Sequence, residues 1–280
     1  IRSSMKILTY NAGLLDHFFT TVPESTLRAR LLGPFLSKSF DRDEVDVALL
    51  QEVWSLEDVE QLREALEDRY LILCPPKNIL LSTGLVSIVR KGAGWTLEDF
   101  HFFEYRHTYL GSWRAFHEII TGFRRGAIMT RLKNEDGVSL VIANTHLTPF
   151  EKNWKLRRRQ LESLSNRLKE ILHPGDLWVI GGDMNHSCEY LKPAAKIKSL
   201  RVLADFKAQW KLADPAENLL TYDPTRNSLA AHCKWGNAGK PLPLDRIWTG
   251  PKDKLDCTKA SLYAEESLAG SHPLSDHYAV

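Results

Sequence analysis

The ten residues from 177 to 186, Leu-Trp-Val-Ile-Gly-Gly-Asp-Met-Asn-His, constrain the fold of this chain more than any other stretch. The apolar run at 177–180 predicts a short strand that is covered on both faces. The two glycines that follow are expected to end the strand and turn the backbone. Side chains two residues apart share one face of an extended chain, so Asp183 and Asn185 are expected to lie side by side there. The alternative is an ordinary turn that begins with Asp and Asn.

Apolar runs and helical patterns continue along the rest of the chain. The expected elements are strands at 5–10, 45–50, 85–89, 127–132, 140–144, 177–180 and 244–248, a last strand within 272–280, and helices around 27–36, 55–68 and 154–172. Ser55 is expected to cap the second helix, with Asp58 three residues on. The pattern predicts a single α/β domain over residues 5–280, and Ile1–Ser4 are expected to be a remnant of cloning.

Composition excludes some classes of protein and leaves others open. The four cysteines are scattered, with no Cys-x-x-Cys pair, so neither a zinc site nor a disulfide framework is expected. No apolar run is long enough to span a bilayer, so any membrane contact is expected to be peripheral. No signal-peptide pattern is visible, which makes the cytoplasm the default location. A net charge of +2 neither indicates nor excludes a nucleic-acid partner.

Polar side chains stand at the ends of the predicted strands, where packing alone would not place them. They are Asn11, Glu52, His146, Asp183 with Asn185, Asp245, and Asp276 with His277. Each alone is most simply a solvated strand end or a hydrogen-bonded structural residue. Six such positions in one chain are hard to explain separately. Carboxylates with amide and imidazole neighbours, and without a thiolate, suit a hard cation such as Mg²⁺.

The order of these residues resembles the motifs of the endonuclease/exonuclease/phosphatase superfamily over residues 5–280. The matching motifs are Thr-Tyr-Asn at 9–11, Leu-Gln-Glu-Val at 50–53, Thr-His-Leu at 145–147, Gly-Asp-Met-Asn at 182–185, Asp-Arg-Ile at 245–247 and Ser-Asp-His at 275–277. The resemblance implies a four-layer α/β sandwich, in which helices flank two packed mixed or antiparallel sheets. It also implies metal-dependent cleavage of a phosphodiester.

The resemblance implies a metal site and a set of catalytic residues. By this resemblance Glu52 binds the cation, with Asn11 beside it and Asp276 near it; Mg²⁺ is expected, with Mn²⁺ or another divalent cation as the alternative. The implied catalytic set is Asp183 to orient or deprotonate the attacking water, Asn185 and His146 to hold phosphoryl oxygens, and His277, steadied by Asp245, to stabilise the charged transition state.

Several stretches are similar to neutral sphingomyelinases. These stretches are Glu-Val-Trp at 52–54, Leu-Leu-Gly-Pro-Phe-Leu at 31–36, Ser-Thr-Gly-Leu at 82–85 and Pro-Leu-Ser-Asp-His at 273–277. By contrast, Arg-Arg-Gly at 124–126 departs from that group. Thr-Tyr-Asp at 221–223 and Asp-Arg-Ile at 245–247 resemble the nuclease and tyrosyl-DNA phosphodiesterase branches. A sphingomyelinase C-like phospholipid hydrolase at a membrane surface is expected; the alternatives are a nuclease or DNA-end phosphodiesterase and, more remotely, a non-catalytic binding module.

Two further features bear on the substrate. Aromatic residues crowd into 100–123: Phe100, Phe102, Phe103, Tyr105, Tyr109, Trp113, Phe116 and Phe123. They suit packed core, seating in a lipid interface, or stacking on bases. A basic cluster follows the His146 motif and consists of Lys152, Lys155, Arg157, Arg158 and Arg159. It is either a solvated helix face or a surface for phosphates or anionic lipid.

Overall fold

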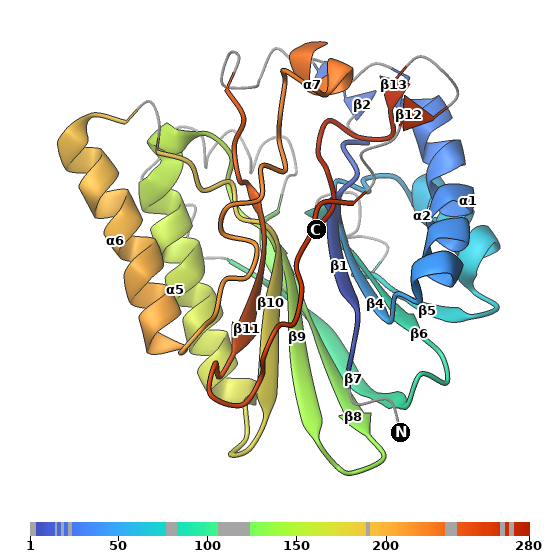
Figure 1. Ribbon diagram of the computed structural model, residues 1–280, viewed down its shortest axis with the longest axis horizontal. Coiled ribbons are helices and arrows are strands. Elements are labelled where there is room, and N and C mark those ends of the chain that lie inside the picture. The colour runs from blue at the N-terminus through green and yellow to red at the C-terminus, as the bar shows by residue number, and fades with distance from the viewer. Residues whose placement is uncertain are drawn as a thin grey trace.

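The computed structural model describes residues 4–14, 16–17, 20–21, 24–76, 83–105, 124–188, 191–232, 240–263, 267–268 and 272–280. Two β-sheets pack face to face, and helices cover the outer face of each sheet (Figure 1). The four-stranded sheet has the order β1 (Ile7–Asn11), β4 (Val47–Gln51), β6 (Val86–Arg90), β5 (Tyr70–Leu73). It is covered by α1 (Ser25–Asp43) and α2 (Leu56–Leu66).

The second sheet has five strands and carries the other helices. Its order is β11 (Asp245–Gly250), β10 (Leu177–Asp183), β9 (Ser139–His146), β8 (Gly126–Asn134), β7 (Trp95–Glu104). Its outer helices are α5 (Trp154–Ile171), which follows a short 3₁₀ turn η2 (Glu151–Asn153), and α6 (Pro193–Gln209). The smaller elements are β2 (Asp16–His17), β3 (Thr20–Thr21), α7 (Ser228–His232), β12 (Ser267–Leu268) and β13 (His272–Pro273). The pairs β1–β4 and β9–β10 are parallel and the other pairs in the two large sheets are antiparallel, so the four-layer mixed sandwich is confirmed.

The buried apolar residues fall into layers that follow this sandwich. One cluster joins α1 and α2 to the first sheet, with Leu32, Leu62 and Leu50 among its members. A second joins α5 and α6 to the second sheet. A third fills the space between the sheets and contains Leu49 of β4 and Ile142 of β9. Neighbouring residues of β4, Leu49 and Leu50, therefore face different layers, as the alternation of a strand requires.

Local sequence signals place several elements correctly. Ser55 caps α2 as predicted: its hydroxyl accepts from the Asp58 N–H, and the Asp58 carboxylate accepts from the Ser55 N–H. In α1, Leu27 is 48% exposed and does not belong to the buried helical face. That helical face instead begins with Arg28, which is buried in phase with Leu32 and Leu36. No described helix combines the length and apolar character needed to cross a bilayer.

Other expectations fail for reasons of tertiary structure. The strands β5 and β7 and the helix α6 were not among the expected elements. The last strand within 272–280 is present but short, since β13 covers only His272–Pro273. The chain end instead lies along β1, where the N–H groups of Thr9 and Val280 each donate to the other residue's carbonyl at 2.9 and 3.0 Å. Such pairing depends on long-range contacts, which local sequence patterns do not predict.

The two glycines of the opening motif lie inside β10 and do not end it. Gly181 and Gly182 pair with β9 on one side and β11 on the other. A Cβ on Gly181 would lie 2.5 Å from Leu49 Cδ1 in the facing sheet. At Gly182, whose φ is +140°, it would lie 1.8 Å from the Thr145 carbonyl oxygen. The glycines are needed because β9 and the opposite sheet approach this strand closely.

A buried polar network joins the two sheets directly below the strand ends. The Gln51 Nε2 donates to Asn144 Oδ1 at 2.9 Å, and Asn144 Nδ2 donates to the carbonyls of Leu50 and Val86 at 3.1 and 2.9 Å. Asn144 and Gln51 are both fully buried. One amide therefore satisfies groups of β4 and β6 from a position on β9.

Replacing Asn144 by Ala is expected to lower the free energy of unfolding by about 2–5 kcal/mol, because it removes three buried hydrogen bonds, one from the Gln51 amide and two to the carbonyls of Leu50 and Val86. Urea unfolding measures the change. The matched control is Thr130→Val. Thr130 is buried in the same sheet and its hydroxyl has no hydrogen-bond partner among the described residues. The control is expected to stay within about 1 kcal/mol of wild type, and an equal loss in both variants would contradict the role of the network.

Candidate active site

Six chain segments bring their polar residues to one edge of the sandwich. The strands β1, β4, β9 and β10 all end at this edge, and β11 begins there, because it runs antiparallel to β10 (Figure 1). This is the edge where layered α/β folds usually place their sites. The structure brings together all the residues that the sequence singled out: Asn11, Glu52, His146, Asp183, Asn185, Asp245, Asp276 and His277.

Asp183 is the best-connected acid at this edge. Its Oδ2 accepts from Asn11 Nδ2 at 3.0 Å and lies 3.5 Å from His146 Nε2, while its Oδ1 accepts from the Asn185 N–H at 2.8 Å. The side chain is buried. Burial, reinforced by the neighbouring Asp245 carboxylate, raises the pKa of Asp183 to about 7. A carboxylate with such a pKa is suited to accept a proton near neutral pH.

Asn185 stands beside Asp183 through a turn rather than through an extended strand. Its φ of +48° lies in the left-handed region, so the expected extended geometry is wrong. Asn and Asp tolerate this conformation, and the hydrogen bond from the Asn185 N–H to Asp183 closes the turn. The Asn185 amide Nδ2 donates to the Leu147 carbonyl at 3.0 Å, which fixes the side chain next to His146. The turn that was the alternative to a functional site at Asp183 and Asn185 is therefore itself part of the candidate site.

Glu52 lies immediately beyond β4, in a strained position. Its φ is +57°, which for a non-glycine residue marks a conformation maintained by its surroundings. Asn11 Nδ2 donates to Glu52 Oε1 at 3.2 Å as well as to Asp183, so one amide spans both acids. Burial and the charge of Asp276 raise the pKa of Glu52. The side chain remains 22% exposed, so it is reachable from solvent.

This group of acids fits a divalent cation. Glu52 and Asp276 are close enough for their charges to oppose each other, and a cation between them would relieve that repulsion. The Asp276 side chain packs closely on the backbone at Gly13, where a Cβ would lie 2.6 Å from Asp276 Oδ1, so glycine leaves room for this carboxylate. The other candidate set is Asp183, Asp245 and His277, whose ligand atoms lie within 4.8 Å of one another. There, however, Asp245 and His277 already bind each other.

The Asp245–His277 pair is a buried, hydrogen-bonded dyad. The Asp245 Oδ2 lies 2.7 Å from His277 Nδ1, and Asp245 is completely buried. Thr221 Oγ1 accepts from the Leu244 and Asp245 N–H groups at 3.1 and 3.0 Å, which fixes the position of the acid. Burial would lower the pKa of His277, but the charge and hydrogen bond of Asp245 outweigh it and raise that pKa well above its usual range. His277 is therefore an imidazolium near neutral pH.

His146 has the opposite charge state. Its Nε2 lies 3.5 Å from Asp183 and 3.8 Å from Glu52, and the ring is buried. Burial, together with the nearby cations Arg125 and His277, holds the pKa of His146 well below its usual range, so the ring is neutral. One histidine of the site thus carries a positive charge while the other serves as a neutral hydrogen-bonding group.

Arg28 is a site residue that sequence reasoning missed. Its Nη1 donates to the carbonyls of Ala12 and Leu274 at 3.2 and 2.8 Å, and its Nη2 donates to Gly13 at 2.7 Å. These carbonyls lie just after Asn11 and just before Asp276, so the buried guanidinium ties together two segments that carry site residues. The available signal was its position in phase with the apolar face of α1. Ser275, whose hydroxyl donates to the Asn11 carbonyl at 2.5 Å, makes a second such link.

The basic cluster after His146 requires one correction. Arg157 is buried, and its guanidinium donates to the carbonyls of Thr148, Phe150 and Glu151 at 2.9, 2.7 and 3.2 Å. It supports the loop that follows His146 and is excluded as a phosphate contact. The remaining members, Lys152, Lys155, Arg158 and Arg159, are exposed.

The aromatic stretch is only partly within the described residues. Tyr105 is core: it is completely buried, and its hydroxyl lies 2.7 Å from Thr145 Oγ1. Phe102 and Phe103 are half-buried on β7, and Phe100 is 38% exposed. The others, Tyr109, Trp113, Phe116 and Phe123, lie outside the described residues.

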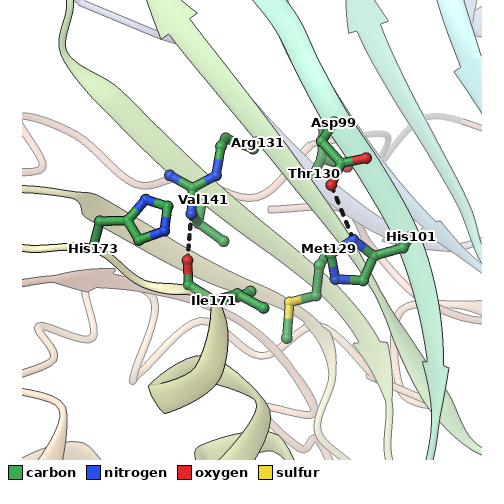
Figure 2. Close-up of a pocket in the computed structure, with 8 residues that line it drawn as sticks. All are labelled: Asp99, His101, Met129, Thr130, Arg131, Val141, Ile171 and His173. Atoms are coloured by element: carbon green, nitrogen blue, oxygen red, sulfur yellow. Dashed lines mark hydrogen bonds and ion pairs between the residues drawn. The ribbon is translucent and has the colours of Figure 1, made fainter.

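A cavity of about 200 Å³ lies away from this edge, where the end of α5 meets β7, β8 and β9 (Figure 2). It is lined by Asp99, His101, Met129, Thr130, Arg131, Val141, Ile171 and His173. Arg131 donates to Asp176, Ser139 and the Ile171 carbonyl, so its guanidinium is used structurally. None of the residues singled out by sequence lines this cavity.

Comparison with known proteins identifies the fold. No protein-family model matches the chain, and no curated protein matches it. Among solved structures, TDP2 from D. rerio in complex with a single-strand DNA product has a TM-score of 0.69 at 18% identity, covering 99% of this chain and 97% of that chain. Beta toxin from Staphylococcus aureus has a TM-score of 0.65 at 20% identity, covering 99% and 98%. An endonuclease/exonuclease/phosphatase family protein from Bacteroides thetaiotaomicron has a TM-score of 0.64 at 15% identity, covering 98% and 95%. The chain has the endonuclease/exonuclease/phosphatase fold, as its motifs predicted.

Proposed function

We propose that the protein is a metal-dependent phosphodiester hydrolase. The observation that carries the proposal is the presence of two complementary groups at one strand edge: the carboxyl group of Asp183, with a pKa raised to about 7, and the imidazolium of His277, whose pKa is also raised. An acid that accepts a proton and a cation that stabilises developing negative charge are what attack of water on a phosphodiester requires. The fold and the ordered motifs support the same reaction class.

In this mechanism each polar residue has a defined task. Asp183 takes a proton from water as the water oxygen forms a bond to phosphorus and the bond from phosphorus to the leaving oxygen breaks. His277, held by Asp245, stabilises the charge that builds on the phosphoryl group. Asn185 and the neutral His146 hold the phosphoryl oxygens. Arg28 is a positioning residue that acts through the two loops it ties together.

Glu52, with Asn11 beside it and Asp276 near it, is proposed to hold the cation, and Mg²⁺ is the ion that the oxygen-rich donor set favours. A bound cation would supply positive charge to a phosphoryl oxygen. Glu52→Gln is expected to weaken Mg²⁺ binding at least about tenfold, because it removes one unit of ligand charge, and chelator should abolish activity until Mg²⁺ is restored. Mg²⁺ titration followed by calorimetry measures the affinity. Asp245→Asn serves as the comparison, since a larger loss in that variant would instead place the cation at Asp183, Asp245 and His277.

Binding of a cation at these acids is expected to release protons from them. Asp183 and Glu52 have raised pKa values, so in the metal-free protein their stabilising contribution is present at low pH and is lost as pH rises through those raised values, which for Asp183 is about 7. His277, whose pKa is also raised, changes stability in the same direction. Cation binding requires the deprotonated acids, so added Mg²⁺ should raise the Tm more at about pH 8 than at about pH 6. An Mg²⁺ effect on Tm that is independent of pH would contradict this linkage.

We propose a phospholipid as the substrate, in a reaction of the sphingomyelinase C type that releases a phosphorylated headgroup and a neutral lipid. The motif resemblance at 31–36, 52–54, 82–85 and 273–277 supports this choice. The second candidate is nucleic acid, in a nuclease or DNA-end phosphodiesterase. It is favoured by the likeness to the TDP2 structure that contains a single-strand DNA product.

A side-by-side assay with Mg²⁺ separates the two substrates. Sphingomyelin vesicles and single- and double-stranded DNA are offered at low and moderate salt. Lipid hydrolysis is expected to show only modest salt sensitivity. DNA binding through exposed cations would weaken steeply with salt because each phosphate contact releases counterions. Hydrolysis of DNA with none of sphingomyelin would refute the lipid proposal and leave the proposed roles of Asp183 and His277 intact.

A further inference from the structure

The outward face of α6 carries an apolar stripe where a surface helix is normally polar. Ile197 is 67% exposed, the highest value among the exposed large apolar side chains of the described chain, and Leu200 is 48% exposed. Ala204 continues the stripe at helical spacing and is also exposed. The inward face is apolar as well, with Leu203 and Phe206 buried against the sheet. A helix that is apolar on both faces presents its outer one for contact with something other than water.

Positive charges flank this stripe. Lys198 and Arg201 are exposed in the first half of the helix with Ile197 and Leu200, and the N-cap residue Lys192 is exposed at its start. The first turn of α6 contains no acidic residue. Asp205, which lies 3.6 Å from Arg201, is the first acid along the helix. Lys198 and Arg201 border one side of the 197–200 stripe at helical spacing, and Lys192, the N-cap residue, stands at the start of the helix.

The same half of α6 lies next to the site. α5 and α6 both begin at the edge where β9 and β10 end, so the exposed cations at the start of α5 add charge at the same end of the molecule (Figure 1). Ser199, on the inward face of α6, lies with both its hydroxyl and its carbonyl oxygen 3.3 Å from His186 Nε2. His186 is one residue beyond Asn185. The helix is therefore fastened to the loop that carries Asn185.

We propose that this face of α6, formed by Lys192, Ile197, Lys198, Leu200 and Arg201, docks on an anionic membrane surface. Apolar side chains can enter the boundary between headgroups and acyl chains while the cations beside the stripe and at the start of the helix meet anionic headgroups. A nucleic acid would use the cations but would leave the apolar stripe in water, so the lipid surface accounts for more of the face. The relevance of this docking to catalysis rests on the proposed lipid substrate. The docking itself is measured as vesicle binding, without turnover.

Co-sedimentation of the whole chain with vesicles in the presence of chelator tests the docking. The probes are phosphatidylcholine vesicles and vesicles of phosphatidylcholine with phosphatidylserine. Ile197→Gln/Leu200→Gln is expected to weaken binding to both kinds of vesicle by at least about tenfold. Lys192→Gln/Lys198→Gln is expected to remove most of the preference for phosphatidylserine, about fivefold for each cation.

Matched control variants lie at the opposite end of the molecule. Val138→Gln removes an apolar side chain that is 37% exposed in the turn between β8 and β9. Lys252→Gln/Lys254→Gln removes two exposed cations just beyond the end of β11. Both controls are expected to bind vesicles like wild type. Circular dichroism and urea unfolding of each variant establish that it is folded.

Three results would overturn the docking proposal. One is wild-type binding that neither α6 pair changes more than its control. Another is binding of DNA by wild type, with steep salt dependence, that is weakened in the Lys192→Gln/Lys198→Gln variant and unchanged in the Ile197→Gln/Leu200→Gln variant. The third is a wild-type dimer that Ile197→Gln/Leu200→Gln converts to monomer without any effect on vesicles. Turnover of a small soluble phosphodiester by wild type is measured separately, so a failure of the proposed hydrolase activity is distinguished from a failure of docking.

Discussion

An Asp183→Asn enzyme is expected to have a kcat about 10²–10⁴-fold below wild type, with little change in KM. The amide keeps the shape of the side chain but cannot accept a proton from water. Asp183 is buried, and its raised pKa makes it the acid of the site best suited to exchange a proton near neutral pH. A soluble phosphodiester is the preferred substrate because its turnover reports on chemistry alone. A variant within a few-fold of wild type would place the centre of the site elsewhere.

The structure also predicts how Asp183→Asn affects stability. Both oxygens of Asp183 accept N–H groups, one from Asn11 and one from Asn185, so the amide nitrogen of the variant must face a donor. That cost is opposed by the removal of a poorly solvated carboxylate. The fold is therefore expected to survive, and urea unfolding tests whether it does. If the activity lost in Asp183→Asn matched the fraction of the variant that is unfolded, the catalytic role of Asp183 would be refuted.

Asp176→Asn is the matched control for this variant. Asp176 is a second buried aspartate, and it accepts from the His173 N–H and from Arg131, both at 2.8 Å, at the far end of α5. Those contacts lower the pKa of Asp176, so its charge stabilises the fold above the unfolded pKa and that stability is lost as pH falls through the folded value. Asp176→Asn should therefore lower stability while leaving kcat unchanged. The two variants together separate a catalytic carboxylate from a structural one.

Much of the site could be predicted because its residues are local interruptions of apolar runs. Asn11, Glu52, His146 and Asp183 each stand at or just beyond the end of a buried strand. Parallel pairing of β1 with β4 and of β9 with β10 then brings them to one edge, although they lie far apart in sequence. A buried strand and a polar residue at its end are both visible in sequence. Their convergence follows once the strands are placed in two packed sheets.

What could not be predicted depends on backbone groups and on close approach between layers. Arg28 acts on carbonyls as far as 246 residues away, and a carbonyl carries no sequence signature. Gly181 and Gly182 appear as strand terminators in sequence because the residues that require them, Leu49 and Thr145, belong to other strands. Helix α6 was missed because apolar residues on both of its faces obscure the period of a one-sided helix.

Separating Asp245 from His277 should change both rate and pH dependence. His277→Ala removes the stabilising cation and is expected to lower kcat by about 10²–10³-fold. Asp245→Asn keeps the imidazole but removes the largest charge that raises its pKa, so the pKa of His277 falls, less imidazolium is present at a given pH, and kcat falls. The two residues act as one unit, so the double variant is expected to be little worse than His277→Ala alone.

The pH profile of kcat distinguishes this account from simple loss of structure. Activity that needs the protonated form of His277 is present at low pH and disappears as pH rises through the pKa of that group. Asp245 raises the pKa of His277, so Asp245→Asn should move the alkaline limb of the profile to lower pH and narrow the profile, because the acid limb is still set by protonation of Asp183. A merely structural role for Asp245 would lower kcat equally at every pH at which the variant is folded. An alkaline limb that stays in place in Asp245→Asn would show that another group carries the charge, because 2.7 Å is too close for loss of the carboxylate to leave the imidazole unaffected.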